Sequence, residues 1–171
     1  MHGNEPVGRE LIIHLAKYMV LANQQQKNDL NDDLMARALK LLTTTDLWIL
    51  PTLNPDGFAI SKEGECHGRG RQNSNAIDLN RNFPQWNNIN QSAHSTGFEK
   101  ETQLLMNWTH TYPFVLSANF HDGAVLVNYP FDNYHDTGRR RGVYKTPDHD
   151  VFVELSKVYT YNHPYMTDTT K

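Results

Sequence analysis

A histidine and a glutamate near the N-terminus are spaced to share a metal ion. His2 and Glu5 lie three residues apart, so one turn of chain can bring an imidazole and a carboxylate to a single divalent cation. A catalytic zinc site needs three protein ligands and an open position, and two histidines with one glutamate form an established set. The pair is also compatible with a helix N-terminus, where the helix dipole favours an acidic side chain.

The third ligand would have to come from elsewhere in a chain that contains nine histidines. We favour His121, because it ends an apolar segment of strand length and ligands in open α/β sheets bind beyond the carboxyl ends of strands. The remaining histidines fall on expected helices or in polar loops, where a surface or partly buried role is the simpler interpretation. They are His14, His67, His94, His110, His135, His149 and His163.

A stretch rich in arginine and amides, residues 68–83, could bind an anion. Arg81 presents a planar fork that matches a carboxylate, and Asn80 can donate a hydrogen bond beside it. Arg71 could face a carbonyl oxygen that becomes negative in a transition state. A solvated loop whose arginines pair with surface acids explains the same composition equally well.

Apolar patterning predicts the elements that would position these residues. Helical spacing predicts helices from Pro6 to about Met19, near residues 30–41, over 98–112, and from 146 to about 161. Apolar runs predict strands at residues 46–53, 114–121 and 124–129, the first closed by turn chemistry at residues 54–57. Helices alternate with strands, so we expect an α/β fold with a mixed, largely parallel sheet flanked by helices, in one domain over residues 1–171.

Composition excludes several classes of function. The net charge of −3 over 171 residues argues against nucleic acid as a main partner, because binding to phosphates needs a basic face. The chain has no run of 18 apolar residues, so no membrane span is expected within it. Its one cysteine, Cys66, excludes a disulfide inside the chain and a cysteine-built zinc site.

Four motifs in order give a resemblance to a known family. They are residues 2–10 (HGNEPVGRE), 53–58 (LNPDGF), 78–84 (DLNRNFP) and 128–132 (NYPFD). Together they resemble the zinc metallocarboxypeptidases, in the branch of carboxypeptidases D, E, M and N. The resemblance implies a metallocarboxypeptidase-like fold, an enzyme, and one Zn²⁺ ion bound by His2, Glu5 and His121.

The resemblance also implies roles for residues around the metal. Arg71 stands where the family polarises the scissile carbonyl, and Asn80 and Arg81 match the pair that binds the free C-terminal carboxylate of the substrate. Asp78 matches a carboxylate that orients the first zinc histidine, as is usual for metal-bound imidazoles.

The same likeness extends to the side-chain pocket of the substrate. Asp132 matches the acid that selects C-terminal Arg or Lys, and Tyr129 is expected to line the same pocket. The implied function is a zinc-dependent exopeptidase that releases basic C-terminal residues from peptides and proteins in a secretory or extracellular setting. The sequence indicates no oligomeric state.

The chain departs from the family pattern in two places, and the partner of its one cysteine stays open. No glutamate matches the general base, since Glu154 falls inside an expected helix, so we expect a partial catalytic domain that lacks the first strands and is inactive alone. A naturally short product is the other interpretation. Asp122 stands where glycine is common, and could perturb the zinc or point into solvent. Cys66 could pair with a cysteine beyond these residues or be a free thiol.

Two other functions are compatible with the sequence. A non-catalytic zinc-binding or peptide-binding module would explain the missing base. An aspartoacylase-like deacylase of N-acyl amino acids would also use a His-x-x-Glu pair and a distant histidine, but the motifs at residues 54–57 and 128–132 speak against it.

Overall fold

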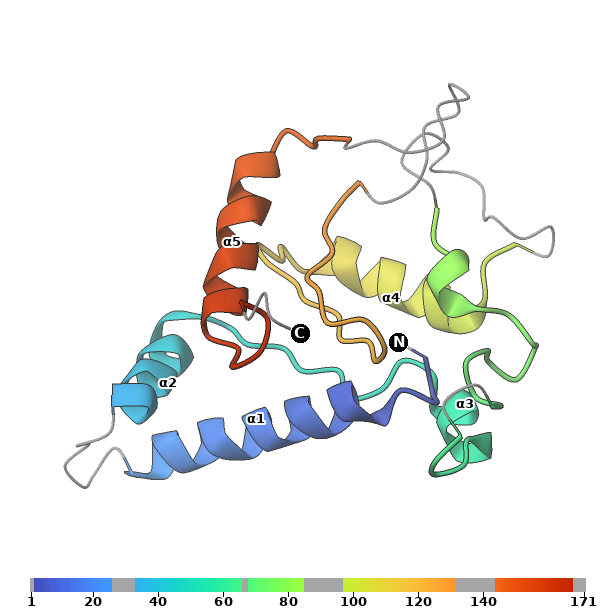
Figure 1. The fold of residues 1–171 in the computed structure, drawn as a ribbon, viewed down its shortest axis with the longest axis horizontal. Coiled ribbons are helices and arrows are strands. Elements are labelled where there is room, and N and C mark those ends of the chain that lie inside the picture. The colour runs from blue at the N-terminus through green and yellow to red at the C-terminus, as the bar shows by residue number, and fades with distance from the viewer. Residues whose placement is uncertain (1, 26–32, 66–67, 85–96, 132–143, 168–171) are drawn as a thin grey trace. The chain divides into compact units, whose positions relative to one another are not determined.

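The computed structural model describes residues 2–25, 33–65, 68–84, 97–131 and 144–167 (Figure 1). The chain divides into two compact units. The first comprises Met1–Pro84 and Asn90–Asp122, and the second comprises Gln85–Ile89 and Gly123–Lys171. All three expected metal ligands belong to the first unit.

The described part of the chain is helical, with long irregular connections between the helices (Figure 1). The first unit contains the α-helices α1 (Pro6–Gln25), α2 (Asp33–Thr44), α3 (Pro55–Ile60) and α4 (Lys100–Thr111), and the 3-10 helix η1 (Leu79–Arg81). The second unit contains α5 (His149–Tyr161). The four helices predicted from apolar spacing are therefore confirmed, whereas α3 and η1 lie in segments that were expected to be turn and loop.

The predicted α/β fold with a largely parallel sheet is wrong for the residues that the structure describes. None of them forms a β-strand, and residues 46–53, 114–121 and 124–129 are irregular. A strand exists only when its N–H and C=O groups pair in a ladder with a neighbour. Apolar runs of strand length identify segments suited to burial, but they do not supply that neighbour.

A small apolar core joins α1 to α2. Met19 and Ala22 of α1 pack with Ala38 of α2, and Tyr18, Met35 and Leu42 border them. The four-residue apolar spacing that predicted the second helix places Ala38 on this buried face. The core lies at the end of α1 that is distant from the N-terminal motif.

A cluster of aromatic rings attaches α4 to two of the irregular segments. Trp48 lies with its ring centroid 5.8 Å from that of Trp108 of α4 and 4.7 Å from that of Tyr112. Trp108 in turn meets Phe114 edge to face at 5.0 Å. Such pairs are favoured beyond the area that they bury, so they fix the start of the segment that leads to His121.

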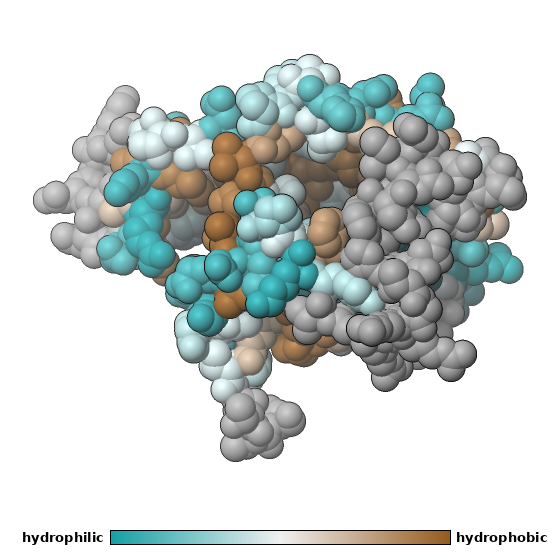
Figure 2. All heavy atoms as spheres, turned by 90° about the horizontal axis from the view of Figure 1, so that it is seen from above, coloured by the Kyte–Doolittle hydropathy of each residue, from teal (hydrophilic) through white to brown (hydrophobic). Residues whose placement is uncertain are grey.

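Other apolar side chains of these segments reach the surface. Val115 is 90% exposed, and Leu116, Leu47 and Leu50 are exposed as well. Apolar residues are visible as brown patches among hydrophilic ones in Figure 2. None of the described helices is long and apolar enough to cross a membrane.

The second unit places Tyr129 against α5. The ring of Tyr129 stacks on Phe152 with centroids 5.8 Å apart and an angle of 6° between the planes. His149 lies at the same centroid distance on a tilted plane. Tyr129 is therefore held by apolar and aromatic contacts of its own unit.

Candidate metal centre

The turn that carries His2 and Glu5 is fixed by backbone contacts before α1 begins. The amides of Gly3 and Asn4 both donate to the carbonyl oxygen of Gly70, at 2.9 and 3.2 Å. Pro6 then opens α1, where a missing N–H costs nothing because the first amides of a helix have no intrahelical partner. The short turn therefore presents both side chains to the same side.

The segment that carries His121 lies directly on the first turn of α1. A Cβ built on Gly8 would lie 2.5 Å from Cβ of Phe120, so a larger residue at this position would push the segment away. The backbone amide of Asp122 donates to Oε2 of Glu5 at 3.2 Å. These contacts bring His121 to Glu5, which lies 116 positions earlier in the chain.

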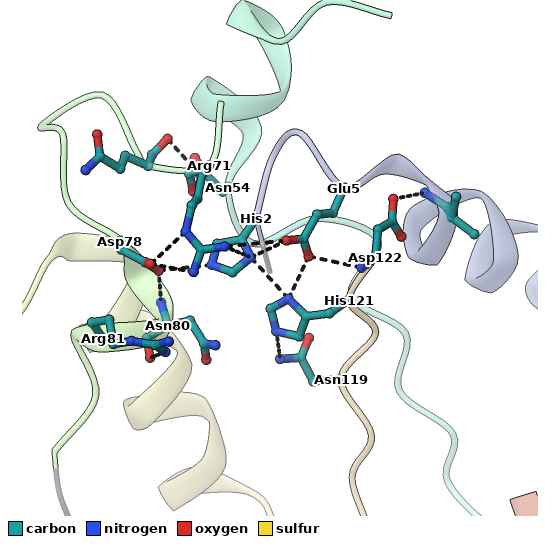
Figure 3. Close-up of polar contacts among 12 residues, drawn as sticks. His2, Glu5, Asn54, Arg71, Asp78, Asn80, Arg81, Asn119, His121 and Asp122 are labelled. Atoms are coloured by element: carbon teal, nitrogen blue, oxygen red, sulfur yellow. Dashed lines mark hydrogen bonds and ion pairs between the residues drawn. The ribbon is translucent and has the colours of Figure 1, made fainter. Parts of the chain in front are cut away.

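The donor atoms of His2, Glu5 and His121 converge on one point (Figure 3). Nδ1 of His2 lies 2.6 Å from Oε1 of Glu5, and Nδ1 of His121 lies 2.6 Å from Oε2. The two Nδ1 atoms are 3.1 Å apart. All three residues thus offer ligand atoms within 4.8 Å of one another.

This donor set fits a zinc ion. Ligand atoms placed about 2.1 Å from zinc in a tetrahedron are roughly 3.4 Å apart, so small outward movements of these side chains would accommodate the metal. Two imidazoles and one carboxylate are ligands that zinc accepts, and they leave a fourth position open. Among the described residues, this is the one group of histidine, cysteine and acidic side chains with such spacing.

Each imidazole is held from its outer side by a second polar group. Nε2 of His2 lies 3.0 Å from Oδ1 of Asp78, and Nε2 of His121 lies 3.1 Å from the side-chain amide of Asn119. The Asp78 carboxylate accepts the Nε2 proton of His2, fixes that ring and leaves Nδ1 free to bind the metal. The Asn119 atom beside Nε2 of His121 is Nδ2, a donor, so the Asn119 amide must turn its Oδ1 toward Nε2 before it can orient this ring in the same way. The side chain of His2 is only 2% exposed, so its ring is also held by burial.

Arg71 lies between Asp78 and the ligand atoms. Its Nε and Nη2 lie 2.9 and 2.8 Å from Oδ2 of Asp78. Nη1 instead lies 3.4 Å from Nδ1 of His2 and 3.7 Å from Oε1 of Glu5. One edge of the guanidinium is thus bound to Asp78, and the remaining nitrogen is directed at the point where the ligand atoms meet.

The protonation states favour metal binding. Burial raises the pKa of Glu5, but hydrogen bonds with His121 and His2 outweigh burial and hold the pKa below its ordinary value. Burial also raises the pKa of Asp78, but contacts with His2 and Arg71 outweigh burial and hold the pKa below its ordinary value. Burial lowers the pKa of His121 against the opposing influence of Glu5. Near pH 7 these shifts favour ionised carboxylates at Glu5 and Asp78 and the neutral imidazole at His121. For Glu5 and His121 these are the forms that bind a metal.

The 3-10 helix η1 presents the predicted anion-binding residues beside Asp78. Oδ1 of Asp78 accepts from the amide of Asn80 at 2.9 Å and so caps η1. Both Asn80 and Arg81 are exposed, and Nη1 of Arg81 donates to the carbonyl oxygen of Asn80 at 3.0 Å. Buried Asn82 then accepts from Glu99 N at 2.7 Å, which fastens η1 to the start of α4.

Asp122 neither faces the ligand atoms nor points freely into solvent. Its Oδ2 lies 3.4 Å from the amide of Val7, in the first turn of α1. A carboxylate at this place is favoured by the helix dipole and by unpaired amides. Asp122 thus joins the His121 segment to α1, a role that the sequence did not reveal.

Two further residues of the site were missed from the sequence. Asn54 was interpreted only as turn chemistry, but its buried side chain bonds to the backbone of the loop that carries Arg71. Asn119 was seen only as part of an apolar segment. Its position two residues before His121, where side chains of an extended chain face the same way, was the available signal.

The remaining predicted site residues lie either in the second unit or outside the described residues. Tyr129 belongs to the second unit. Asp132, Cys66 and the histidines His67, His94 and His135 lie outside the described residues.

Comparison of the sequence with known proteins identifies the family of the chain. The sequence profile of the zinc carboxypeptidase family matches residues 1–171. The chain is 41% identical to carboxypeptidase D of Drosophila melanogaster, 40% to carboxypeptidase M of Mus musculus and 37% to the carboxypeptidase N catalytic chain of Homo sapiens. These matches cover 97%, 98% and 97% of the chain, respectively.

The chain spans 12%, 35% and 40% of the lengths of these three relatives. No solved structure matches it. The family uses Zn²⁺ as its cofactor, and its members are hydrolases. Because the family profile matches residues 1–171, this chain belongs to the zinc carboxypeptidases.

Proposed function

We propose that the chain is the zinc-binding part of an exopeptidase that releases C-terminal Arg or Lys from peptides and proteins. The observation that carries this proposal is the convergence of the His2, Glu5 and His121 donor atoms within 4.8 Å of one another. Nη1 of Arg71 is directed at the same point. A metal ligand set with an adjacent cation suits hydrolysis of a carbonyl compound.

The residues around the metal would have separate tasks. Bound zinc supplies Lewis-acid chemistry for the scissile carbonyl and for the attacking water. Arg71 would donate from Nη1 to the carbonyl oxygen as negative charge develops there. Its other nitrogens bind Asp78, so the guanidinium is oriented before the substrate arrives. Asp78 also holds His2, and one carboxylate therefore positions both the metal ligand and the oxyanion donor.

Asn80 and Arg81 would bind the free carboxylate of the substrate. They follow Asp78 directly on η1 and are exposed on the surface. A guanidinium can bind a carboxylate through two parallel hydrogen bonds, which gives both affinity and direction. Recognition of a terminal carboxylate restricts cleavage to the last peptide bond, and this restriction defines an exopeptidase.

The preference for basic residues is assigned to Asp132, with Tyr129 lining the same pocket. Support for these roles comes from the motif at residues 128–132 and from the likeness to the carboxypeptidase D, M and N branch. An acid inside a pocket disfavours an apolar side chain, which would leave the carboxylate without a partner. The likeness to this branch also leads us to propose a secretory or extracellular setting.

The test is a set of matched peptides offered to the complete zinc-loaded protein. The peptides share one sequence and end in Arg, in Leu, or in Arg with an amidated C-terminus. We expect release of Arg from the first, slower release of Leu from the second, and no cleavage of the third. Cleavage of the amidated peptide would contradict the carboxylate clamp, and equal rates for Arg and Leu would contradict the basic pocket.

A matched variant separates the pocket from the catalytic machinery. Asp132→Asn should reduce kcat/KM for the Arg peptide while the rate for the Leu peptide stays the same or rises. A rate for the Leu peptide that does not fall serves as the control for folding and zinc content. Calorimetry that shows peptide binding without any turnover by the complete protein would instead support a non-catalytic binding module.

A further inference from the structure

Asn54 is a buried amide whose hydrogen-bonding groups all have partners. The residue is 0% exposed and forms the N-cap of α3. Its Oδ1 accepts from the amide of Gly57 at 2.9 Å. Its Nδ2 donates to the carbonyl oxygens of Arg71 and Gln72, at 3.3 and 3.0 Å. The single acceptor and both donor hydrogens are therefore used, which fixes the orientation of the amide.

The partners of Nδ2 belong to the loop that carries Arg71. The same loop is held from its other side, because the carbonyl oxygen of Gly70 accepts from Gly3 and Asn4. Gly70 has a φ of +104°, and a Cβ at this position would lie 2.4 Å from the carbonyl oxygen of Gly57. Residues 70–72 are thus clamped between the metal-ligand turn and the start of α3.

This clamp determines where the side chain of Arg71 begins. The guanidinium must reach Asp78 with two nitrogens and the ligand cluster with the third. The Arg71 side chain is 45% exposed, so packing restrains it little. Its position depends on its contacts with Asp78 and on the placement of its own backbone.

We infer that Asn54 is a positioning residue that holds the Arg71 guanidinium against the metal centre, an inference that rests on the proposed hydrolytic function. Chemistry distinguishes this role from simple helix capping. Asp or Ser can also cap a helix through a side-chain oxygen. Neither can donate to two carbonyl oxygens as the Asn54 amide does, and a carboxylate would place its second oxygen against them.

The decisive variant is therefore Asn54→Asp, with Asn54→Ser as a second variant in case the carboxylate prevents folding. Displacement of a catalytic group by about 1 Å can cost on the order of 100-fold in rate. We expect kcat for the Arg-ended peptide to fall between about 10-fold and 100-fold, with KM and bound zinc unchanged. Met19→Ala is the control for general destabilisation, because Met19 lies in the α1–α2 core about 20 Å along α1 from Pro6.

A double-mutant cycle with Arg71→Ala tests whether the effect passes through Arg71. In the Arg71→Ala background, Asn54→Asp should change kcat by less than about 2-fold, because the group that it positions is gone. An equal loss of kcat with and without Arg71 would overturn the inference. So would an Asn54→Asp enzyme as active as the wild type.

A spectroscopic signal keeps the inference testable if the protein shows no peptidase activity. The Nε–H of Arg71 donates to Asp78, so its resonance in a ¹H–¹⁵N spectrum should be protected from exchange with water. Asn54→Asp should remove this protection, whereas Met19→Ala should retain it. An inactive wild-type protein would refute the proposed function alone, and an unchanged Nε–H signal in Asn54→Asp would refute the positioning role of Asn54.

Discussion

Replacement of Asp78 by asparagine should weaken zinc binding, because this carboxylate holds both His2 and Arg71. Its Oδ1 accepts from Nε2 of His2 and from the amide of Asn80, and its Oδ2 accepts from Nε and Nη2 of Arg71. Asparagine has one oxygen and one NH₂ group of similar shape. Whichever way the amide is turned, at least one pair of these contacts becomes donor against donor.

The size of the effect follows from the role of an outer carboxylate. Loss of a hydrogen-bonding partner behind a metal-bound histidine typically lowers metal affinity by about 10-fold to 100-fold. This range corresponds to about 1.4 to 2.7 kcal/mol in binding free energy. We expect the loss of zinc affinity in Asp78→Asn to fall within this range. In Asp78→Ala the loss should lie at or beyond the upper end, because alanine removes all four contacts.

The assay is competition for zinc against a chromophoric chelator at fixed pH and ionic strength. Asp46→Asn is the matched control, since Asp46 is exposed and its replacement removes the same charge. The control should bind zinc as the wild type does. The reasoning is refuted if both Asp78 variants keep a zinc Kd within about 2-fold of the wild type, well below the range for an orienting partner.

Three further perturbations have defined outcomes. Asn119→Ala should lower zinc affinity by less than Asp78→Ala does, because a neutral amide orients His121 more weakly than a carboxylate orients His2; the same competition assay measures it. Chelation of the metal should abolish peptide cleavage and lower the thermal midpoint, and zinc at 100 times its Kd should restore about 2.7 kcal/mol of stability in calorimetry. Gly70→Ala should lower the free energy of unfolding in urea by more than about 1 kcal/mol, because its φ is positive and its Cβ would meet the backbone of Gly57; a stability equal to the wild type would show that this junction is loose.

The metal-binding residues could be predicted because each is marked by a short-range pattern in the sequence. His2 and Glu5 are three residues apart, and His121 ends an apolar segment, so the choice among nine histidines was possible. The helices were predictable for a similar reason, since apolar spacing along one face depends only on neighbouring turns. Their roles as ligands of zinc stay a prediction until metal binding is measured.

The sheet could not be predicted reliably because strand pairing is not a local property. Residues 46–53 and 114–121 have the composition of buried strands, but in the described structure they are irregular and are held by the Trp48, Trp108 and Phe114 rings. The role of Asn54 was hidden for the same reason. Its amide donates to carbonyl oxygens 17 and 18 residues further along the chain, a distance that no turn motif describes.

The separation of the ligands along the chain gives the metal a second physical consequence. Glu5 and His121 are 116 residues apart, so an ion held by both acts as a tether that closes a long loop. Unlike a covalent cross-link, the ion stabilises the folded unit only to the extent that it is bound there, so its contribution rises with the ratio of free zinc to Kd. Metal occupancy would then govern how often the two ends of the first unit separate, and thereby its resistance to unfolding and to proteolysis.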